Sequence, residues 1–247
     1  MALAGGVKIR TFGGFQVFVH DQPVQFEHKA QRRPLALLKA LIALGGSDVK
    51  TDYLADELWP DSDGDAAEQA LATTLHRLRK LLGQGDPLIL RDGMLTLNRR
   101  TCWVDAWCFD EFINEAGSCK TNHSLTLRQN ALRLYQGTFL PANEEEPLTD
   151  AMRKRLRGKF IQCVLRLCER WDQDKKHELS ISCLQAALGL ESQVELFYEQ
   201  LTVNLQRLGR QSEAIGVYHQ YCESLSEQDV RSPSVNMQRL YEQLQGT

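Results

Sequence analysis

The chain has 247 residues, of which 43% are hydrophobic and 25% are charged, and its formal net charge is −3. This length accommodates one large or two ordinary domains, and the composition is that of a globular protein. No run approaches the roughly 18 apolar residues that span a bilayer, and the N-terminus lacks a secretory signal, so we expect a cytoplasmic protein with no membrane partner. The 7 cysteines are an odd number without a C-x-x-C spacing, which predicts reduced core residues, no metal site and no cofactor.

The N-terminal segment predicts a small antiparallel sheet. Residues 7–13 and 15–20 alternate apolar and polar side chains on either side of the Gly13-Gly14 turn. A third short strand is expected at residues 24–27, after a turn at Asp21–Pro23.

Three amphipathic helices and a hairpin follow this sheet. The helices are expected at 32–44, 51–59 and 66–82, and the third has a capping-box-like start at Asp65–Glu68. Its buried stripe is formed by Leu71, Leu75, Leu78 and Leu82. The Asp92-Gly93 pair suits a tight turn, so a hairpin is predicted at residues 88–97. This order predicts an α+β winged helix-turn-helix with an N-terminal antiparallel sheet.

The rest of the chain predicts helices and no strand. Apolar periodicity covers residues 105–116, 125–136, 148–174, 176–189, 193–208, 211–227 and 234–245. A weak repeat at an offset of 34, which aligns Ser180 with Ala214, matches the tetratricopeptide spacing. Trp103 and Trp107 are expected at a helix start, packing between two modules. We therefore predict two domains, a winged helix at residues 1–101 and an all-α, tetratricopeptide-like domain at residues 102–247.

The outer face of helix 66–82 is the main candidate for a binding site. The side chains farthest from the leucines, or on the flanks of that face, are small, neutral polar or basic, whereas the acids are expected in the first turn. Amide and hydroxyl groups can contact base edges in the major groove, and basic groups can contact phosphates or guanine. The candidates are Gln69, Thr73, Thr74, His76, Arg77, Arg79 and Lys80.

Three further arginines fit contacts with DNA outside this helix. Arg91 lies beside the hairpin turn and suits a wing contact with the backbone or the minor groove, whereas Arg32 and Arg33 suit phosphate binding at a helix N-terminus. A polar outer face is also usual for any surface helix, and the first 101 residues are nearly neutral, with 13 basic and 12 acidic side chains. The charge pattern alone therefore leaves DNA binding and a plain solvated surface open. The basic run 153–159 is better interpreted as a solvated helix face than as a second phosphate site.

Six segments, in this order, resemble the Streptomyces antibiotic regulatory protein family, in which an OmpR-type winged helix is joined to a bacterial transcriptional activator domain. They are Arg33–Lys39, Leu54–Pro60, Thr74–Lys80, Trp103–Trp107, Leu134–Pro141 and Gly209–Tyr218. The resemblance implies a sequence-specific activator that binds tandem direct repeats of double-stranded DNA, often as head-to-tail pairs, and recruits RNA polymerase.

The same resemblance implies a polymerase contact in the loop before the recognition helix, formed by Pro60, Asp61, Ser62, Asp63 and Gly64. Ala72 departs from the acidic residue that many OmpR-type helices carry at this position, so the family's base preference does not transfer.

The alternative hypothesis is a helical-repeat interaction scaffold with a degenerate winged helix. The sequence carries no catalytic motif, so we do not expect an enzyme. A small-molecule or protein ligand of the helical domain, a homodimer on DNA, and a role as the output part of a larger regulator all stay open.

Overall fold

The computed structural model describes residues 6–26, 31–83, 85–119, 122–141, 147–226 and 232–245. The chain divides into a first unit of Met1–Glu115 with Arg133–Arg157 and a second unit of Ala116–Leu132 with Gly158–Thr247. The chain thus leaves the first unit and returns to it, so these units do not follow a linear division at residue 101. The domain ranges 1–101 and 102–247 stay a prediction.

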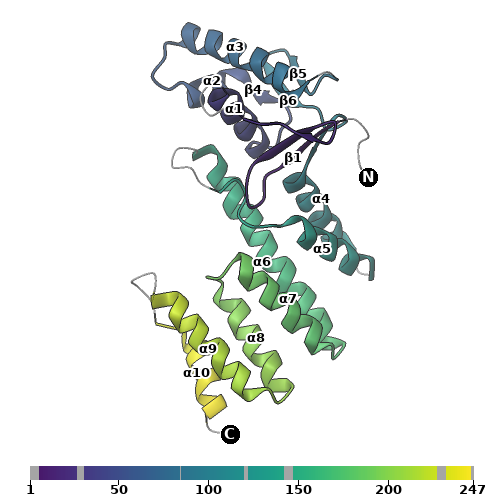
Figure 1. Ribbon diagram of the computed structural model, residues 1–247, viewed down its shortest axis with the longest axis vertical. Coiled ribbons are helices and arrows are strands. Elements are labelled where there is room, and N and C mark those ends of the chain that lie inside the picture. The colour runs from purple at the N-terminus through teal and green to yellow at the C-terminus, as the bar shows by residue number, and fades with distance from the viewer. Residues whose placement is uncertain are drawn as a thin grey trace. The chain divides into compact units, whose positions relative to one another are not determined.

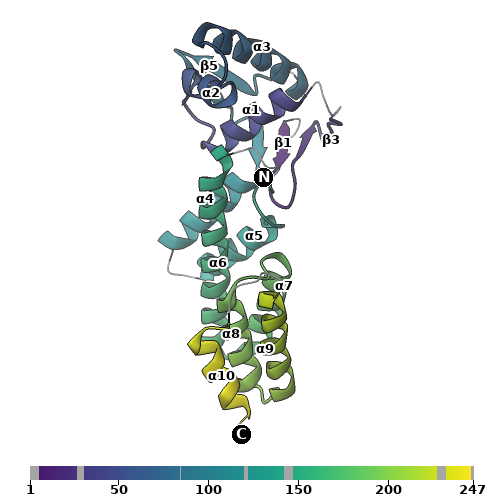
Figure 2. The same cartoon turned by 90° about the vertical axis from the view of Figure 1, so that its left-hand side faces the viewer.

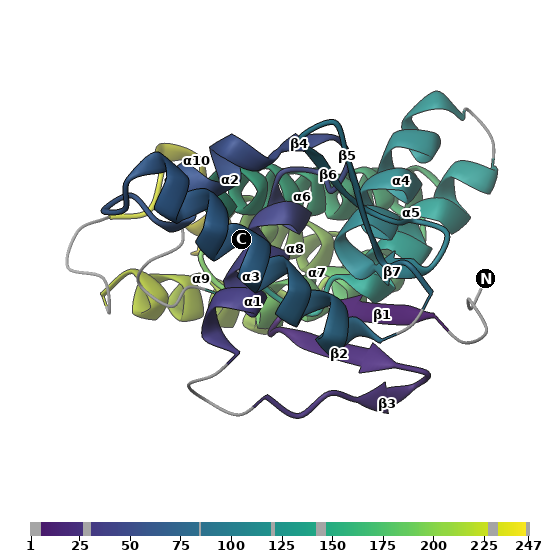
Figure 3. The same ribbon diagram turned by 90° about the horizontal axis from the view of Figure 1, so that it is seen from above.

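The N-terminal sheet has four strands, seen side by side from above for β1, β2 and β3 in Figure 3. The first two predicted strands form β1 (Val7–Arg10) and β2 (Gln16–Val19), which pair antiparallel. The third strand was misplaced, because β3 (Gln22–Pro23) occupies the predicted turn and residues 24–26 are not in a strand, while Glu27 lies outside the described residues. The prediction of no strand beyond residue 101 is wrong, because β7 (Cys102–Val104) pairs in parallel with β1. Three residues are too few for alternation to be recognised in the sequence.

The winged helix surrounds a second sheet of order β4-β6-β5 (Figure 1). Its helices are α1 (Arg32–Ala43), α2 (Thr51–Leu58) and α3 (Gly64–Leu82), and its strands are β4 (Val49–Lys50), β5 (Leu88–Arg91) and β6 (Met94–Leu97). Asp92 and Gly93 both have positive φ, 49° and 71°, as a type I′ turn requires, so the predicted hairpin is confirmed. The core contains Leu37, Leu38, Leu41, Leu54, Leu78 and Leu95, all fully buried.

A later part of the chain completes the first unit beside the N-terminal sheet. Phe12 forms a β-bridge with Phe139, and the flanking backbone bonds join Gly13 N to Thr138 O at 3.0 Å and Leu140 N to Thr11 O at 2.8 Å. Phe12 also contacts the rings of Phe109 and Tyr135, with centroids 5.4 and 4.7 Å away. The resemblance segment Leu134–Pro141 therefore has a structural role in holding β1.

Trp107 closes the end of α1. It lies on α4 (Asp105–Ser118), its indole Nε1 donates to Ile42 O at 3.3 Å, and its ring covers Gly46. The Arg99 guanidinium lies 4.4 Å from its ring centroid. Trp103 lies on β7 and not on a helix, which corrects the expectation that both tryptophans share a helix start between two modules.

The remaining elements are α5 (Asn122–Leu134), a 3-10 turn (Pro147–Thr149), α6 (Asp150–Gln173), α7 (His177–Leu190), α8 (Glu195–Arg207), α9 (Gln211–Ser226) and α10 (Val235–Gln245). Figure 2 shows α7 to α10 as neighbouring helices, and α8 packs against α7, α9 and α10. Since α7 begins at residue 177 and α9 at residue 211, the offset of 34 is that of two repeated helices. Within the described residues, no helix is long and apolar enough to cross a membrane.

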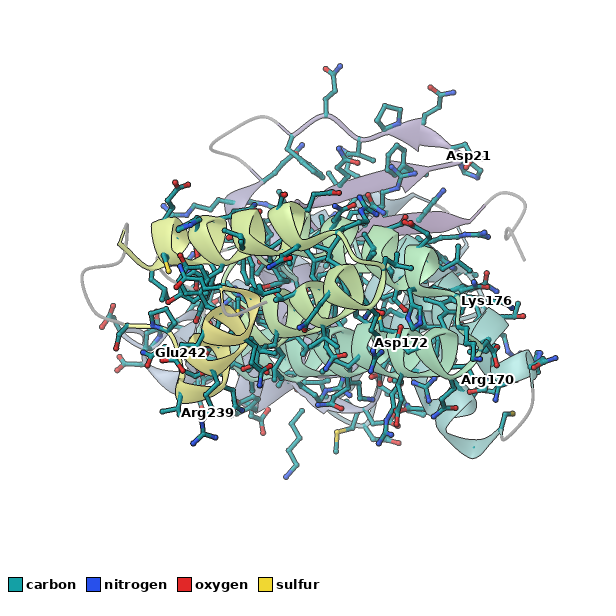
Figure 4. The ribbon with its side chains drawn as sticks, turned by 90° about the horizontal axis from the view of Figure 1, so that it is seen from below. Asp21, Arg170, Asp172, Lys176, Arg239 and Glu242 are labelled. Carbon is teal, nitrogen blue, oxygen red and sulfur yellow. The ribbon has the colours of Figure 1, made fainter. Side chains whose placement is uncertain are left out.

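An acid whose side chain is 12% exposed joins three helices of the second unit. Asp172, labelled in Figure 4, accepts hydrogen bonds from Ser180 Oγ at 2.7 Å, Asn204 Nδ2 at 3.1 Å and Arg207 at 3.2 Å. His177 Nδ1 lies 3.4 Å from the same carboxylate. These groups come from α6, α7 and α8, so the network fixes the register of the repeat helices.

Candidate nucleic-acid interface

Helix α3 is held by its apolar face against α1 and α2. The predicted stripe of Leu71, Leu75, Leu78 and Leu82 is buried, and Ala67 extends it. The helix begins at Gly64, two residues earlier than expected, with Asp63 at the N-cap and no side-chain cap hydrogen bond, so the predicted capping box does not form. This packing leaves the opposite side of the helix open to solvent.

The exposed side of α3 carries almost all of the predicted candidates. Gln69, Thr73, His76, Arg77, Arg79 and Lys80 are exposed. The Thr73 hydroxyl donates to Gln69 O at 3.0 Å, which leaves the hydroxyl oxygen available as an acceptor. Because α3 begins at Gly64, Glu68 lies just beyond the first turn, on the flank of this face. We call the side chains of 69, 72, 73, 76, 77 and 80 the α3 face.

Thr74 does not belong to this exposed side. It is 5% exposed, on the buried side of the helix, so the prediction that it contacts DNA is corrected. On a helical wheel Thr74 lies at the edge of the leucine stripe, and the buried arc is wider than the leucines alone indicate.

The wing is tied directly to the start of α2. Thr51 donates both its backbone N–H and its hydroxyl to Gly93 O, each at 2.9 Å. Arg91 is exposed beside this turn, as predicted. Ile89 and Leu90 on β5 are also 40% and 46% exposed, a feature that we did not predict although the run Leu88–Leu90 is visible in the sequence. The wing therefore presents apolar side chains next to its arginine.

The predicted polymerase-contact residues form the exposed connection between α2 and α3, together with the first residue of α3. Pro60, Asp61, Ser62, Asp63 and Gly64 are all exposed. A backbone bond from Ser62 N to Trp59 O at 3.1 Å turns the chain, and Asp63 O accepts from Ala67 N at 2.8 Å at the start of α3. The loop is thus a surface feature with a defined backbone.

The two arginines at the start of α1 differ in their surroundings. Arg33 donates to Leu58 O at 2.6 Å, and its guanidinium lies 5.6 Å from the centroid of the Trp59 ring. It therefore binds the C-terminal end of α2, where the helix dipole favours a cation, and it is not poised as a phosphate anchor. This contact was not predictable, because Leu58 is 25 residues away in the sequence. Arg32 is exposed at the first residue of α1.

Asp105 is a buried acid that the sequence pattern did not single out. It is 4% exposed and accepts hydrogen bonds from Thr11 N at 2.9 Å, Thr11 Oγ1 at 2.5 Å, Phe12 N at 3.2 Å and Ala106 N at 2.8 Å. Burial raises the pKa of this carboxyl, and the hydrogen bonds from Thr11, Phe12 and Ala106 oppose that rise. The residue joins the end of β1 to the start of α4.

Two arginines of the basic run on α6, Arg153 and Arg155, belong to the first unit and are bound by other residues of that unit. Arg153 donates to Phe139 O at 3.0 Å and to Leu140 O at 2.7 Å, and it pairs with Asp150. Arg155 pairs with Asp110 at 3.0 Å. These contacts favour a structural role for both arginines over a second phosphate-binding strip.

Comparisons with known proteins identify regulatory relatives. Residues 104–245 match the family model of the bacterial transcriptional activator domain. The chain is 31% identical over 191 residues to Regulatory protein AfsR of Streptomyces griseus, covering 74% of this chain and 19% of the relative. It is 29% identical over 219 residues to Regulatory protein AfsR of Streptomyces coelicolor, covering 85% and 21%. The chain thus spans about one fifth of the length of these relatives.

A solved structure of similar fold is that of Mycobacterium tuberculosis EmbR in complex with a low affinity phosphopeptide. It superposes with a TM-score of 0.66 at 19% identity, covering 97% of this chain and 65% of that chain, which supports the winged-helix and helical-domain architecture. The family model of the bacterial transcriptional activator domain covers more than half of the chain. The chain therefore belongs to the bacterial transcriptional activator domain family, among the regulators that resemble the Streptomyces antibiotic regulatory proteins.

Proposed function

We propose that the chain is a sequence-specific DNA-binding transcriptional activator in which α3 lies in the major groove. The observation that carries the proposal is the α3 face, a solvent-exposed helix surface of small, neutral polar and basic side chains opposite a buried leucine stripe. A major groove admits one α-helix, and a face without central acids meets no repulsion from the phosphates.

Each exposed group then has a role that follows from its chemistry. Gln69 and Thr73 contact base edges, whereas Arg77 and Lys80 neutralise phosphates or reach guanine. His76 of the α3 face and Arg79 at its border add contacts, and Arg32 contacts a phosphate. Arg91 of the wing contacts the backbone or the minor groove, with Ile89 and Leu90 beside it.

Activation requires a contact with the transcription machinery as well as with DNA. The exposed loop of residues 60–64 is the proposed contact with RNA polymerase, because it lies between α2 and α3 and its side chains are open to solvent. Pairs of chains bind tandem direct repeats in this proposal. Family membership supports the role in activation, since the matched domain is named for transcriptional activation.

The first experiment is selection of random duplexes with the purified chain, followed by fluorescence anisotropy on the selected site. The logarithm of the association constant should fall with that of the salt concentration, with a slope of about −0.9 for each phosphate that is neutralised. Lys80→Ala should weaken binding to all sequences alike and reduce this slope by about 1, whereas Gln69→Ala should relax the base preference at one position.

Arg239→Ala is the matched control, since Arg239 is an exposed cation on α10 of the second unit (Figure 4). It should leave affinity and salt slope unchanged. If no duplex is enriched, or if Lys80→Ala and Arg239→Ala behave alike, α3 is not the reading helix. The interaction-scaffold alternative would then be the better account of the chain.

A further inference from the structure

A groove of about 780 Å³ lies along β1 in the first unit, and none of its lining residues belongs to α3. Its lining comes from the outward side of β1, from β7 and the start of α4, and from the end of α5. The polar and aromatic residues that matter for the argument are Lys8, Arg10, Asp21, Trp103, Arg133 and Gln136.

The cations of β1 point into this groove because of the strand's alternation. Val7 and Ile9 are buried at 4% and 0% exposure, so Lys8 and Arg10 lie together on the opposite side of the strand. Residues two apart on a strand are separated by about 6.5–7 Å. The two side chains therefore leave β1 at positions that have the repeat of an extended chain.

Aromatic rings hold both cations in place. Lys8 Nζ lies 5.5 Å from the centroid of the Trp103 ring, and the Arg10 guanidinium lies 5.4 Å from that of Phe18. Lys8 lies directly opposite Trp103 of β7, whereas Arg10 is paired with Gln16 and reaches Phe18 of β2 as its diagonal neighbour. Such contacts orient a side chain without neutralising its charge.

The positive charge of the groove is not balanced by its acids. Among the residues that the structure describes, Lys8, Arg10 and Arg133 take part in no salt bridge. Asp105 contributes to the lining, where its oxygens accept hydrogen bonds from Thr11, Phe12 and Ala106, so the three cations of the lining face two acids, Asp105 and Asp21. Asp21, in the β2–β3 turn, is the exposed acid of the lining.

We propose that this groove binds an acidic peptide segment of a partner protein in extended conformation. Alternate carboxylates of the peptide pair with Lys8 and Arg10, and a further one with Arg133. Gln136, whose Nε2 donates to Arg133 O at 2.9 Å, accepts a peptide N–H with its Oε1. The repeat of the two β1 cations matches side chains i and i+2 of an extended chain. A DNA duplex is too wide to enter a hollow of this volume, so the groove is distinct from the α3 face.

The test uses the full chain and a fluorescein-labelled hexapeptide of alternating glutamate and serine, followed by fluorescence anisotropy at low salt. A hexapeptide of the same composition with its glutamates at positions 1, 2 and 5, so that no two of them are two residues apart, tests the repeat, and one of alternating lysine and serine tests the charge. We expect the alternating acidic peptide to bind most tightly and to weaken as salt is added.

The double variant Lys8→Gln/Arg10→Gln should lower the affinity for that peptide about tenfold, since it removes two exposed ion pairs, each of which strengthens binding by a few-fold. Arg133→Gln should weaken it less, and Arg239→Gln is the matched control that should not change it. Circular dichroism of each variant verifies the fold. Arg133→Gln on α5 provides a second measurement should the double variant fail to fold.

Failure of the alternating acidic peptide to bind, equal binding of the three peptides, or unchanged binding by the Lys8→Gln/Arg10→Gln and Arg133→Gln variants would each overturn the proposal. Displacement of the peptide by the duplex selected with this chain would also overturn it, by assigning the cations to DNA. DNA binding by the double variant is expected to equal that of the unmodified chain, so this inference and the proposed function can fail separately.

Discussion

Asp105 illustrates how one side chain can join segments that are distant in the sequence. Its carboxylate meets only hydrogen-bond donors, from Thr11, Phe12 and Ala106. In Asp105→Asn one acceptor oxygen is replaced by an amide NH₂ that faces the backbone N–H groups. We expect the free energy of unfolding to fall by about 1–3 kcal/mol, because a buried donor loses its acceptor. Urea denaturation measures this difference.

The control for that variant is Asp110→Asn, which changes a more exposed acid in the same helix, where Asp110 pairs with Arg155. An exposed ion pair contributes about 0–1 kcal/mol. Equal losses for the two variants would show that the hydrogen bonds to Asp105 do not stabilise the first unit.

The cysteines provide a second prediction for single residues. Burial raises the pKa of Cys102 to about 11 and that of Cys163 to about 12. Below its pKa a thiol is mostly protonated, so at pH 8 about one in a thousand Cys102 side chains, and fewer of Cys163, is in the reactive thiolate form. We expect neither to be alkylated by iodoacetamide in the folded chain and both to react after denaturation, as measured by mass spectrometry.

Fast labelling of either cysteine at pH 8 without denaturant would contradict this prediction. Raising the pH should increase the labelling rate of both, provided that the fold persists, because the thiolate fraction grows tenfold per pH unit below the pKa. Both thiols are free and buried, in agreement with their interpretation as small core residues.

The end of helix α1 depends on two glycines that differ in one respect. Gly45 and Gly46 both have positive φ, 90° and 73°. A Cβ on Gly45 would meet no atom within 4 Å, whereas a Cβ on Gly46 would lie 2.3 Å from the Trp107 ring. Gly45→Ala should therefore cost about 1–2 kcal/mol of backbone strain, and Gly46→Ala should cost about 1–3 kcal/mol more through the clash.

Thermal unfolding of the two variants, followed by circular dichroism, separates the contributions of strain and overlap. The melting temperature should fall more for Gly46→Ala than for Gly45→Ala. If the two variants melt together, Trp107 does not cover Gly46 in solution. Changes in tryptophan fluorescence that are confined to Gly46→Ala would support the contact.

Elements with a long, regular pattern were predictable from the sequence, and short or non-local features were not. The leucine stripe of α3 and the Asp92-Gly93 turn each have a local signature, and both are confirmed. The strands β4 and β7 have two and three residues, so they show no period, and their pairing depends on distant partners.

The candidate site shows the same division between local and distant causes. The exposure of the α3 face follows from helical periodicity, which is why most of its residues were identified. Arg33 was assigned to phosphate binding because it lies at the start of a helix, and its contact with Leu58 O was missed because that acceptor lies on another helix. Thr74 was misplaced because the sequence does not reveal how much of α3 is covered by α1 and α2.

At the scale of the whole molecule, the first unit consists of two separate stretches of chain. A fragment of residues 1–101 lacks β7, Asp105 and the partners of Phe12 on α4 and in segment 134–141. A fragment of residues 1–157 retains all of them. We expect the longer fragment to unfold cooperatively and the shorter one to melt more than about 10 °C lower, because several kcal/mol of contacts are missing.

Differential scanning calorimetry of the two fragments provides the measurement. Equal melting temperatures would establish residues 1–101 as an autonomous domain and would favour the boundary predicted from the sequence. Hydrogen exchange along β1 locates the defect, since this strand is expected to lose protection in the shorter fragment when its parallel partner is absent.

The parallel pairing of β1 with β7 also constrains how regulators of this kind can exchange parts. A hybrid gene joined at residue 101 would combine the β1 strand of one parent with the β7 strand and the buried aspartate of the other. A productive crossover therefore has to carry Met1–Glu115 and Arg133–Arg157 from the same parent. Swapping DNA specificity between such proteins is better attempted by grafting side chains of the α3 face than by transplanting the N-terminal segment.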